Sequence, residues 1–291
     1  MFKLSAAPAP EGTLVEKRVH LSSIPLTTRV LVSGAGSPVL LLHGSPDSAS
    51  EWTRVMNALD GDRACFAPDL PGLGACEEPP ETFDYSRAAI NQFIDELVSA
   101  LDIREPLILV VHDIGGVMGI PWAAEHLDRI RGVVITNSVV FERFPWFGVA
   151  KVWARSDPLG RAQAALRMRL VGAGGGFLFR RVFGRISPEL PPADLERMTY
   201  EFAMNPAAKR STLRLFRQMV PPEFFDGFDS MVARIVAKVP TRIVWGQGDP
   251  YIPERYSNRF SGAQLTVQGR AGHWVPISSA NEVAKAIKAL A

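Results

Sequence analysis

The sequence predicts an α/β fold: a mostly parallel, twisted sheet of about eight strands flanked by helices, with a helical segment inserted after the sixth strand. Three observations predict it. Short apolar runs at residues 39–42, 107–111 and 132–137 are typical of strands buried on both faces. Helical stretches separate these runs, as in parallel β-α-β units with right-handed crossovers. This alternation stops after residue 137 and returns only near residue 241.

The first elements lead up to the central strand. Apolar and polar residues alternate at 13–21 and 27–32, as they do in strands with one face in water. The apolar strand at 39–42 ends in the loop His-Gly-Ser-Pro-Asp, which begins at His43. We then expect a helix at 52–59, a strand at 64–69 and an amphipathic helix at 85–101.

The central stretch joins a strand directly to a helix. The strand at 107–111 is followed by His-Asp-Ile, then by Gly115 and Gly116, and a helical pattern runs over 117–126. A strand that turns into a helix within a few residues has a crowded backbone, which small residues relieve. The residue at the tip of this turn is Asp113. Asp is also a favoured helix N-cap, so the turn alone leaves both interpretations open.

Residues 138–226 are expected to form a helical cap, or lid, over a core domain made of residues 1–137 and 227–291. The segment is rich in Phe and Trp, and its helical pieces are broken by glycines at 172–176 and by Pro191-Pro192. An ordinary helical subdomain with its own small core is the alternative. After it we expect strands at 241–249 and 265–268 and a closing amphipathic helix at 280–290.

Composition limits the classes of function. The 291 residues carry a net charge of only +2, so no nucleic acid and no anionic membrane surface is expected as a partner. With only two cysteines, Cys65 and Cys76, a disulfide framework or a zinc site is not expected. Residues 1–10 lack the apolar region of an export signal, and no run is long enough to span a bilayer, so we expect a cytoplasmic protein.

Three ionisable residues directly follow predicted strands or the loops after them. Asp113, Asp249 and His273 stand in the chain order nucleophile, acid, base. In a parallel sheet, functional groups gather at the carboxyl ends of the strands, where these three would meet. Together with the turn at His43-Gly44, this order resembles the α/β-hydrolase fold over nearly the whole chain.

Within that fold, Asp113 at the tip points to displacement at a saturated carbon. A carboxylate has a reference pKa of about 3.9, so it is ionised at neutral pH and attacks without a base, leaving an alkyl ester on the enzyme. His273 would then activate water, while Asp249 fixes the tautomer of its imidazole. The backbone N–H groups of Ile114 and Ser45 are the expected oxyanion donors.

The motifs His-Asp-x-Gly-Gly at the turn and His-Gly-x-Pro after the third strand resemble the epoxide hydrolase and haloalkane dehalogenase branch of this fold. The resemblance implies that Asp113 is the nucleophile, His273 the base and Asp249 the acid. Asn137 stands where some dehalogenases carry the acid, and an amide cannot serve as one. We also expect no cofactor and no metal.

The chain departs from both subfamilies at the residues that assist the leaving group. Ile114 and Ser45 occupy positions where dehalogenases usually carry Trp and Asn, and Phe216 stands where epoxide hydrolases carry a tyrosine. Tyr200 is the only tyrosine of the segment 138–226, and Trp146 and Trp153 are its tryptophans. The residues that we expect to line the substrate pocket are His43, Asn137, Trp146, Trp153, Tyr200, Phe216 and Trp274.

Three functions remain open from the sequence. The first is hydrolysis of an epoxide to a diol, with Tyr200, Ser45 or water as the proton donor. The second is hydrolysis of a haloalkane, which requires Trp146 or Trp153 to reach the site. The third is a ligand-binding protein or a non-hydrolytic catalyst on the same fold. In the first two cases we expect an apolar small molecule and water as reactants. We expect the protein to be a monomer or a homodimer.

Overall fold

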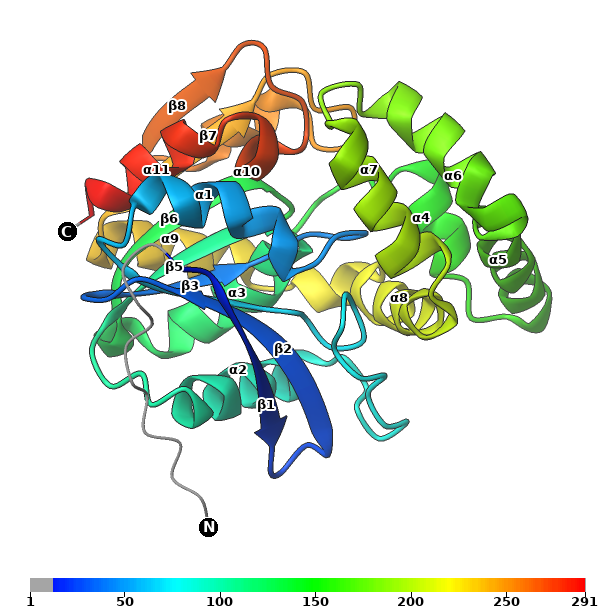
Figure 1. The fold of residues 1–291 in the computed structure, drawn as a ribbon, viewed down its shortest axis with the longest axis horizontal. Coiled ribbons are helices and arrows are strands. Elements are labelled where there is room, and N and C mark those ends of the chain that lie inside the picture. The colour runs from blue at the N-terminus through cyan, green and yellow to red at the C-terminus, as the bar shows by residue number, and fades with distance from the viewer. Residues whose placement is uncertain (1–12, 291) are drawn as a thin grey trace.

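The computed structural model describes residues 13–290 and confirms the predicted α/β-hydrolase fold (Figure 1). Within these residues an eight-stranded sheet has the order β1-β2-β4-β3-β5-β6-β7-β8. β2 runs antiparallel to both of its neighbours, and the remaining pairs are parallel. Residues 1–10, which we expect not to form an export signal, lie outside the described part. The strands are β1 Val15–Leu21, β2 Leu26–Ser33, β3 Pro38–Leu42, β4 Ala64–Pro68, β5 Leu107–Asp113, β6 Ile130–Ser138, β7 Thr241–Gly246 and β8 Gln264–Gln268.

Helices cover both faces of the sheet. α1, α10 and α11 pack on one face, and α2, α3 and α9 pack on the other (Figure 1). Each face has its own apolar cluster, so the central strands are buried on both sides, as their continuous apolar runs predict. These helices are α1 Thr53–Leu59, α2 Arg87–Ala100, α3 Ile114–Glu125, α9 Phe228–Lys238, α10 Val275–Ser278 and α11 Ala280–Lys288, with 3₁₀ turns η1 Ala49–Trp52, η2 Leu127–Arg129, η4 Pro222–Phe225 and η5 Glu254–Arg259.

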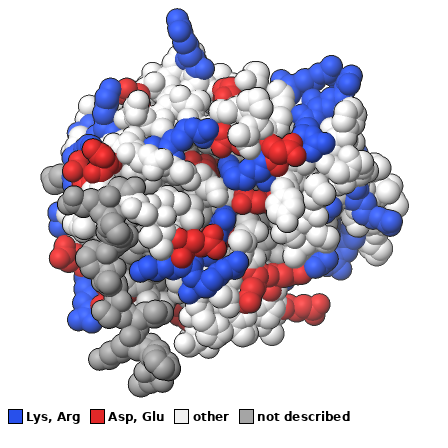
Figure 2. Space-filling model, viewed as in Figure 1, with Lys and Arg blue, Asp and Glu red and all other residues white. Residues whose placement is uncertain are grey.

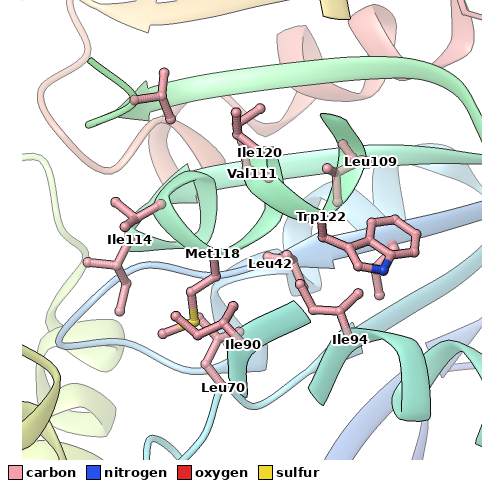
Figure 3. Close-up of a cluster of buried hydrophobic side chains, with 14 of the residues drawn as sticks. Leu42, Leu70, Ile90, Ile94, Leu109, Val111, Ile114, Met118, Ile120 and Trp122 are labelled. Carbon is pink, nitrogen blue, oxygen red and sulfur yellow. The ribbon is translucent and has the colours of Figure 1, made fainter. Parts of the chain in front are cut away.

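The turn from β5 to α3 is tighter than the sequence indicates. β5 extends to Asp113 and α3 begins at Ile114, three residues before the predicted start. This start requires glycine, because a Cβ on Gly115 would lie 2.2 Å from the carbonyl oxygen of Leu42 and one on Gly116 would lie 2.0 Å from Ser138 Oγ. The helix therefore packs directly onto β3 and β6, and Figure 3 shows its apolar side chains within the core.

A group of helices, here called the inserted helices, follows β6. They gather at one end of the molecule, to the right of the sheet in Figure 1. Their apolar cluster extends to Trp274 and Ile277 of the core, so they pack on it rather than standing apart. Gly174, Gly175 and Gly176 have positive φ and kink the first turn of α6, at the break that the sequence predicts. The inserted helices are α4 Gly148–Trp153, α5 Pro158–Val171, α6 Ala173–Ile186, α7 Pro192–Met198, the π-helix η3 Thr199–Ala203 and α8 Pro206–Met219.

A charged network also joins the inserted helices to the core. Arg197 of α7 donates hydrogen bonds to both carboxylate oxygens of Asp47, which lies in the loop after β3. Glu201 accepts from Arg197 at 3.0 Å and from Ser48 Oγ at 2.7 Å. Burial opposes the charge of Arg197, yet the two carboxylates raise its pKa. The loop that follows β3 is therefore held from above by α7 and η3.

No helix within residues 13–290 is long and apolar enough to cross a bilayer. The thiols of Cys65, in β4, and Cys76, in the loop that follows β4, are both free. Burial raises the pKa of each thiol to about 12, so both remain in the unreactive thiol form at neutral pH.

Candidate active site

Asp113 lies at the tip of the turn in a strained conformation. Its φ of 47° and ψ of −120° place it in a region that non-glycine residues rarely adopt. Its side chain makes no capping hydrogen bond to α3, which argues against the helix-cap interpretation. Instead, Oδ2 accepts the backbone N–H of Ser45 at 3.0 Å, and Ser138 Oγ donates to the backbone carbonyl at 2.6 Å. The carboxylate is thus held away from the helix.

His273 and Asp249 form a buried pair at the same edge of the sheet. Asp249 follows β7, His273 follows β8, and His273 Nδ1 donates to Asp249 Oδ2 at 2.8 Å. The other oxygen of Asp249 accepts the backbone N–H groups of Tyr251 at 2.7 Å and Ile252 at 2.9 Å. These bonds fix the carboxylate, which in turn fixes the imidazole with Nε2 as its free nitrogen.

Asn137 lies behind this pair and does not line the cavity, so the expectation that it is a pocket residue is corrected. Its Nδ2 donates to Asp249 Oδ2 at 2.6 Å, and its Oδ1 accepts the N–H of Gly246 at 2.8 Å. Asn137 is fully buried with a φ of 30°. Its amide, which has a donor and an acceptor, links the ends of β6 and β7 and orients the carboxylate.

The site favours a charged imidazole. Burial opposes the charge of Asp249, but His273 and the N–H donors around it hold the pKa of this carboxyl below its usual value. Burial likewise disfavours the charge of His273, yet the carboxylates of Asp249, Asp113 and Glu51 raise its pKa to about 9. His273 is therefore an imidazolium at neutral pH.

A second buried pair, Glu51 and His112, lies under the turn and was not anticipated from the sequence. Both side chains are fully buried, and His112 Nδ1 lies 2.9 Å from Glu51 Oε1. Glu51 Oε2 accepts the N–H of Gly44 at 3.2 Å, while His112 Nε2 lies 3.0 Å from the carbonyl oxygen of His273. Since a carbonyl only accepts, Nε2 carries a proton. The pair therefore links two segments: Glu51 contacts the loop after β3, and His112 contacts the backbone of His273.

The two residues expected to donate to the oxyanion both line the cavity that holds Asp113. Ser45 lines the cavity and its N–H already faces the carboxylate. Ile114 also lines it, with its side chain 1% exposed and packed in the core (Figure 3). His43 does not line the cavity, contrary to expectation. It is fully buried, with Nδ1 donating to the carbonyl of Gly44 and Nε2 accepting the N–H of Leu70, and it braces the loop.

A cavity of about 520 Å³ lies above Asp113 and His273, between the core and the inserted helices. Its wall is mostly apolar. Ser45, Tyr251 and Arg167 add polar groups to the wall. Four of the predicted pocket residues line it: Trp146, Trp153, Phe216 and Trp274.

Tyr200 does not belong to this cavity, and the expectation that it is a pocket residue is wrong. It lies on η3 with its side chain turned outward and 74% exposed. The tyrosine that lines the cavity is Tyr251, whose ring packs edge-on against His273 with 5.0 Å between centroids. Burial raises its pKa to about 12, so it stays a phenol and a donor. Its place in the loop after β7, two residues from Asp249, is the signal that could have identified it.

The arrangement combines a carboxylate with an N–H donor, a histidine held by an acid, and a phenol, all facing an apolar cavity. A carboxylate in such a setting is a nucleophile toward an electrophilic carbon. A histidine beside it is a general acid when charged and a general base when neutral. These groups are sufficient for a two-step reaction through a covalent ester.

Comparisons with known proteins agree with the fold. A model of the alpha/beta hydrolase family matches residues 39–286. A cis-3-alkyl-4-alkyloxetan-2-one decarboxylase from Shewanella oneidensis is 28% identical over 288 residues, which cover 94% of this chain and 87% of the relative. A haloalkane dehalogenase from Sphingobium indicum is 27% identical over 275 residues, covering 88% of each chain. The solved structure of the epoxide hydrolase CorEH has a TM-score of 0.74 at 18% identity, with 96% of this chain and 98% of that chain covered.

Proposed function

The chain belongs to the alpha/beta hydrolase family, and we propose that it opens a strained oxygen ring through a covalent ester on Asp113. The first candidate reaction is hydrolysis of an apolar epoxide to a diol. The observation that carries this proposal is Tyr251, because it provides a phenol in the cavity that holds Asp113 and His273. The inserted helices act as a cap that gives this cavity its apolar wall.

In the first step, Asp113 attacks a saturated ring carbon and forms an ester while the carbon–oxygen bond of the epoxide breaks. The departing oxygen takes up a proton, and Tyr251 is the donor that assists it. Esterification removes the charge of Asp113, which is one of the charges that raise the pKa of His273. His273 then gives its proton to the phenolate of Tyr251, which restores the phenol and balances the proton gained by the product oxygen.

In the second step, the now neutral His273 removes a proton from water, and the water attacks the carbonyl carbon of the ester. The oxyanion that forms accepts hydrogen bonds from the backbone N–H groups of Ser45 and Ile114. Its collapse releases the diol and restores the carboxylate of Asp113. Asp249 stabilises the imidazolium during this step, as the 2.8 Å hydrogen bond to His273 suggests.

The geometry supports the haloalkane reaction less well. A leaving halide needs N–H donors beside the nucleophile, and the side chain of Ile114 has none. The indole Nε1 atoms of Trp153 and Trp274, two residues that line the cavity, have no hydrogen-bond partner among the described residues, so they are the side-chain N–H donors that this reaction would use. Trp146 lines the cavity but packs against Phe216 and Phe225 in an aromatic cluster. Oxygen leaving groups suit a phenol donor better.

A β-lactone is the second candidate substrate. The relative from Shewanella oneidensis, which aligns with 94% of this chain, is named for a substituted oxetan-2-one. When Asp113 attacks the saturated ring carbon of such a lactone, the group that leaves is a carboxylate, which needs little help from a proton donor. Cleavage of the bond to that carboxylate then expels Asp113 and gives an alkene and CO₂, without water.

The experiment that tests the covalent step uses the His273→Gln variant. Given a terminal alkyl epoxide, this variant should accumulate an ester on the peptide that contains Asp113, detected by intact and peptide mass spectrometry. The Asp113→Asn variant is the negative control. An epoxide that the wild type hydrolyses without adduct formation in His273→Gln would contradict the mechanism.

A single turnover of the wild type in H₂¹⁸O separates the two reactions. Epoxide hydrolysis by the proposed route places ¹⁸O in the carboxylate of Asp113, because water attacks the enzyme ester and not the substrate carbon. With a cis-disubstituted β-lactone, the expected products are an alkene and CO₂, with no label in Asp113. Label found in the diol alone after the first turnover would exclude the ester mechanism.

A further inference from the structure

Two of the inserted helices concentrate positive charge. Residues 158–186, which contain α5 and α6, carry six arginines and no acidic residue. Since the whole chain carries +2 and this segment +6, the rest of the chain carries −4. Figure 2 shows basic side chains gathered on the right of the molecule, where α5 and α6 lie in Figure 1. The low net charge of the chain thus hides a strong local asymmetry.

These arginines are available for binding. Only Arg180 has an acidic partner within residues 13–290, Glu196 at 3.6 Å. Free cations on a surface that lacks anions attract an anionic partner and repel a second copy of themselves. The other five are exposed and form no salt bridge within the described chain: Arg161, Arg167, Arg169, Arg181 and Arg185.

The same helices expose large apolar side chains. On α5, Leu159, Leu166 and Leu170 recur at a helical spacing on the side opposite the buried stripe. Outside the segment 138–226, the large apolar side chains exposed among the described residues are Leu265 and Val267, at 37% each. Six side chains of α5 and α6 are between 44% and 64% exposed: Leu159, Leu166, Leu170, Phe177, Leu178 and Val182.

This apolar surface is continuous with the cavity. Leu170, Leu178 and Val182 are exposed and also line the cavity, and so does Arg167. The cavity therefore opens between α5 and α6, at the surface where apolar and cationic side chains are mixed. An apolar molecule next to this surface would meet an apolar wall all the way to Asp113.

We propose that the α5–α6 surface, formed by these five arginines and six apolar side chains, binds an anionic lipid bilayer and turns the mouth of the cavity toward the lipid. Helices that lie in a bilayer interface combine exposed Leu and Phe with Arg or Lys on the flanks. Lipid phosphates pair with the arginines, and the apolar side chains enter the acyl boundary. This inference goes beyond the proposed reaction and does not depend on it.

A bilayer fits this surface better than the other occupants. A second copy docked through a two-fold axis would bring the arginine clusters together. A nucleic acid would leave Leu159, Leu166 and Phe177 in water, because it offers them no apolar surface. An anionic bilayer provides phosphates for the arginines and an apolar interior for the apolar side chains. It also dissolves apolar molecules of the kind that fit the cavity.

Sedimentation with vesicles tests the proposal on the full-length protein. We expect the wild type to sediment with phosphatidylglycerol–phosphatidylcholine vesicles at low salt and to stay in solution with pure phosphatidylcholine. Leu166→Ser combined with Phe177→Ser should weaken binding at least about tenfold, because two inserted side chains are lost. Leu265→Ser with Val267→Ser is the matched control and should bind as the wild type does.

A second pair of variants tests the charge. Arg161→Gln with Arg169→Gln should weaken binding about twenty-fivefold, at about fivefold for each cation removed near an anionic surface. Arg104→Gln with Lys238→Gln lowers the net charge equally outside α5 and α6 and should leave binding unchanged. If the two double variants lost vesicle binding equally, the assignment of the binding site to α5 and α6 would be overturned.

A fluorescent reporter tests insertion directly. Trp at position 166, made as Leu166→Trp, should shift its emission to the blue when anionic vesicles are added, and brominated lipids should quench it. The proposal is overturned if the wild type does not bind anionic vesicles, or if it binds pure phosphatidylcholine equally well. It is also overturned if Leu166→Ser with Phe177→Ser abolishes a dimer in solution instead of lipid binding. Melting curves check that each variant is folded.

Discussion

Tyr251 is the residue on which the choice of substrate depends. It lines the cavity beside His273 and stays protonated, so it is the proposed donor to a departing ring oxygen. We expect Tyr251→Phe to slow ester formation from an epoxide about a hundredfold, as loss of general acid assistance does. Rapid-quench single turnovers measure this step. Tyr256→Phe, which removes a hydroxyl from a ring stacked on Phe141, is the control.

The same variant distinguishes the two candidate reactions. A β-lactone releases a carboxylate, so Tyr251→Phe should change its rate of opening by less than tenfold. If the epoxide rate is unchanged as well, Tyr251 is not the donor.

The charge of Asp113 is one of the charges that raise the pKa of His273. Burial disfavours the imidazolium, but Asp249 and Asp113 raise the pKa of His273 from 6.5 to about 9. Asp113→Asn removes one of these charges, so it should lower the pKa of His273. NMR titration of the His273 ring in both proteins measures the change. A pKa that stays near 9 in Asp113→Asn would show that Asp113 does not control the base.

This titration also sets a pH dependence of stability. Because the pKa of His273 is higher in the folded protein than the ordinary 6.5, the stabilisation from this group is complete below about pH 6.5. It is lost as pH rises through about 9, so the free energy of unfolding of the wild type should decrease over this interval. The decrease should be smaller in Asp113→Asn.

Side chains that follow strands were easier to predict than those held by tertiary contacts. Asp113, Asp249 and His273 were identified because strand order brings them to one edge, and the structure places them there. Tyr251 was missed because the donor was sought in the segment 138–226, where Tyr200 turns out to face water. No local sequence pattern predicts the Glu51–His112 pair. The two residues are 61 positions apart, and only the folded sheet brings them together.

At the scale of elements, the link between α7 and the loop after β3 holds the insertion on the core. Arg197 is the central residue of this link, since it contacts Asp47 and Glu201. Arg197→Ala would leave the fully buried Asp47 without its cation, so we expect a loss of about 3 kcal/mol in the free energy of unfolding. Urea denaturation measures this loss.

The control for Arg197 removes both members of the pair. Arg197→Met with Asp47→Asn should be less destabilised than Arg197→Ala, because no buried charge is left unpaired. A single substitution that costs less than about 1 kcal/mol would show that the network does not hold the helices.

Breaks between helices that Gly or Pro residues mark were predicted well. The residues at which helices begin were predicted less well. The glycines at 172–176 predicted the break that the structure has at the end of α5 and in the first turn of α6, and Pro191-Pro192 predicted the break before α7. The start of α3 was placed three residues late, because two glycines normally indicate a loop. Here they occur within the first turn, where β3 and β6 approach too closely for a Cβ. Only the folded sheet supplies that constraint.

At the scale of the whole molecule, the net charge does not describe how the charges are distributed. A total of +2 led us to expect no anionic membrane surface, yet this total is the sum of +6 on residues 158–186 and −4 elsewhere. The structure brings those six arginines onto two adjacent helices at the mouth of the cavity. To infer binding partners, the net charge should therefore be calculated for each face of the molecule as well as for the whole chain.

The position of the cavity mouth predicts how turnover depends on the way the substrate is presented. If the α5–α6 surface rests on lipid, an apolar epoxide dissolved in anionic vesicles enters the cavity without crossing water. Turnover of vesicle-borne epoxide should then fall as salt is raised, because salt screens exposed charges, while turnover of a short water-soluble epoxide stays constant. Leu166→Ser with Phe177→Ser should lose only the vesicle-borne rate. Equal salt dependence for both substrates would show that the substrate reaches Asp113 through water.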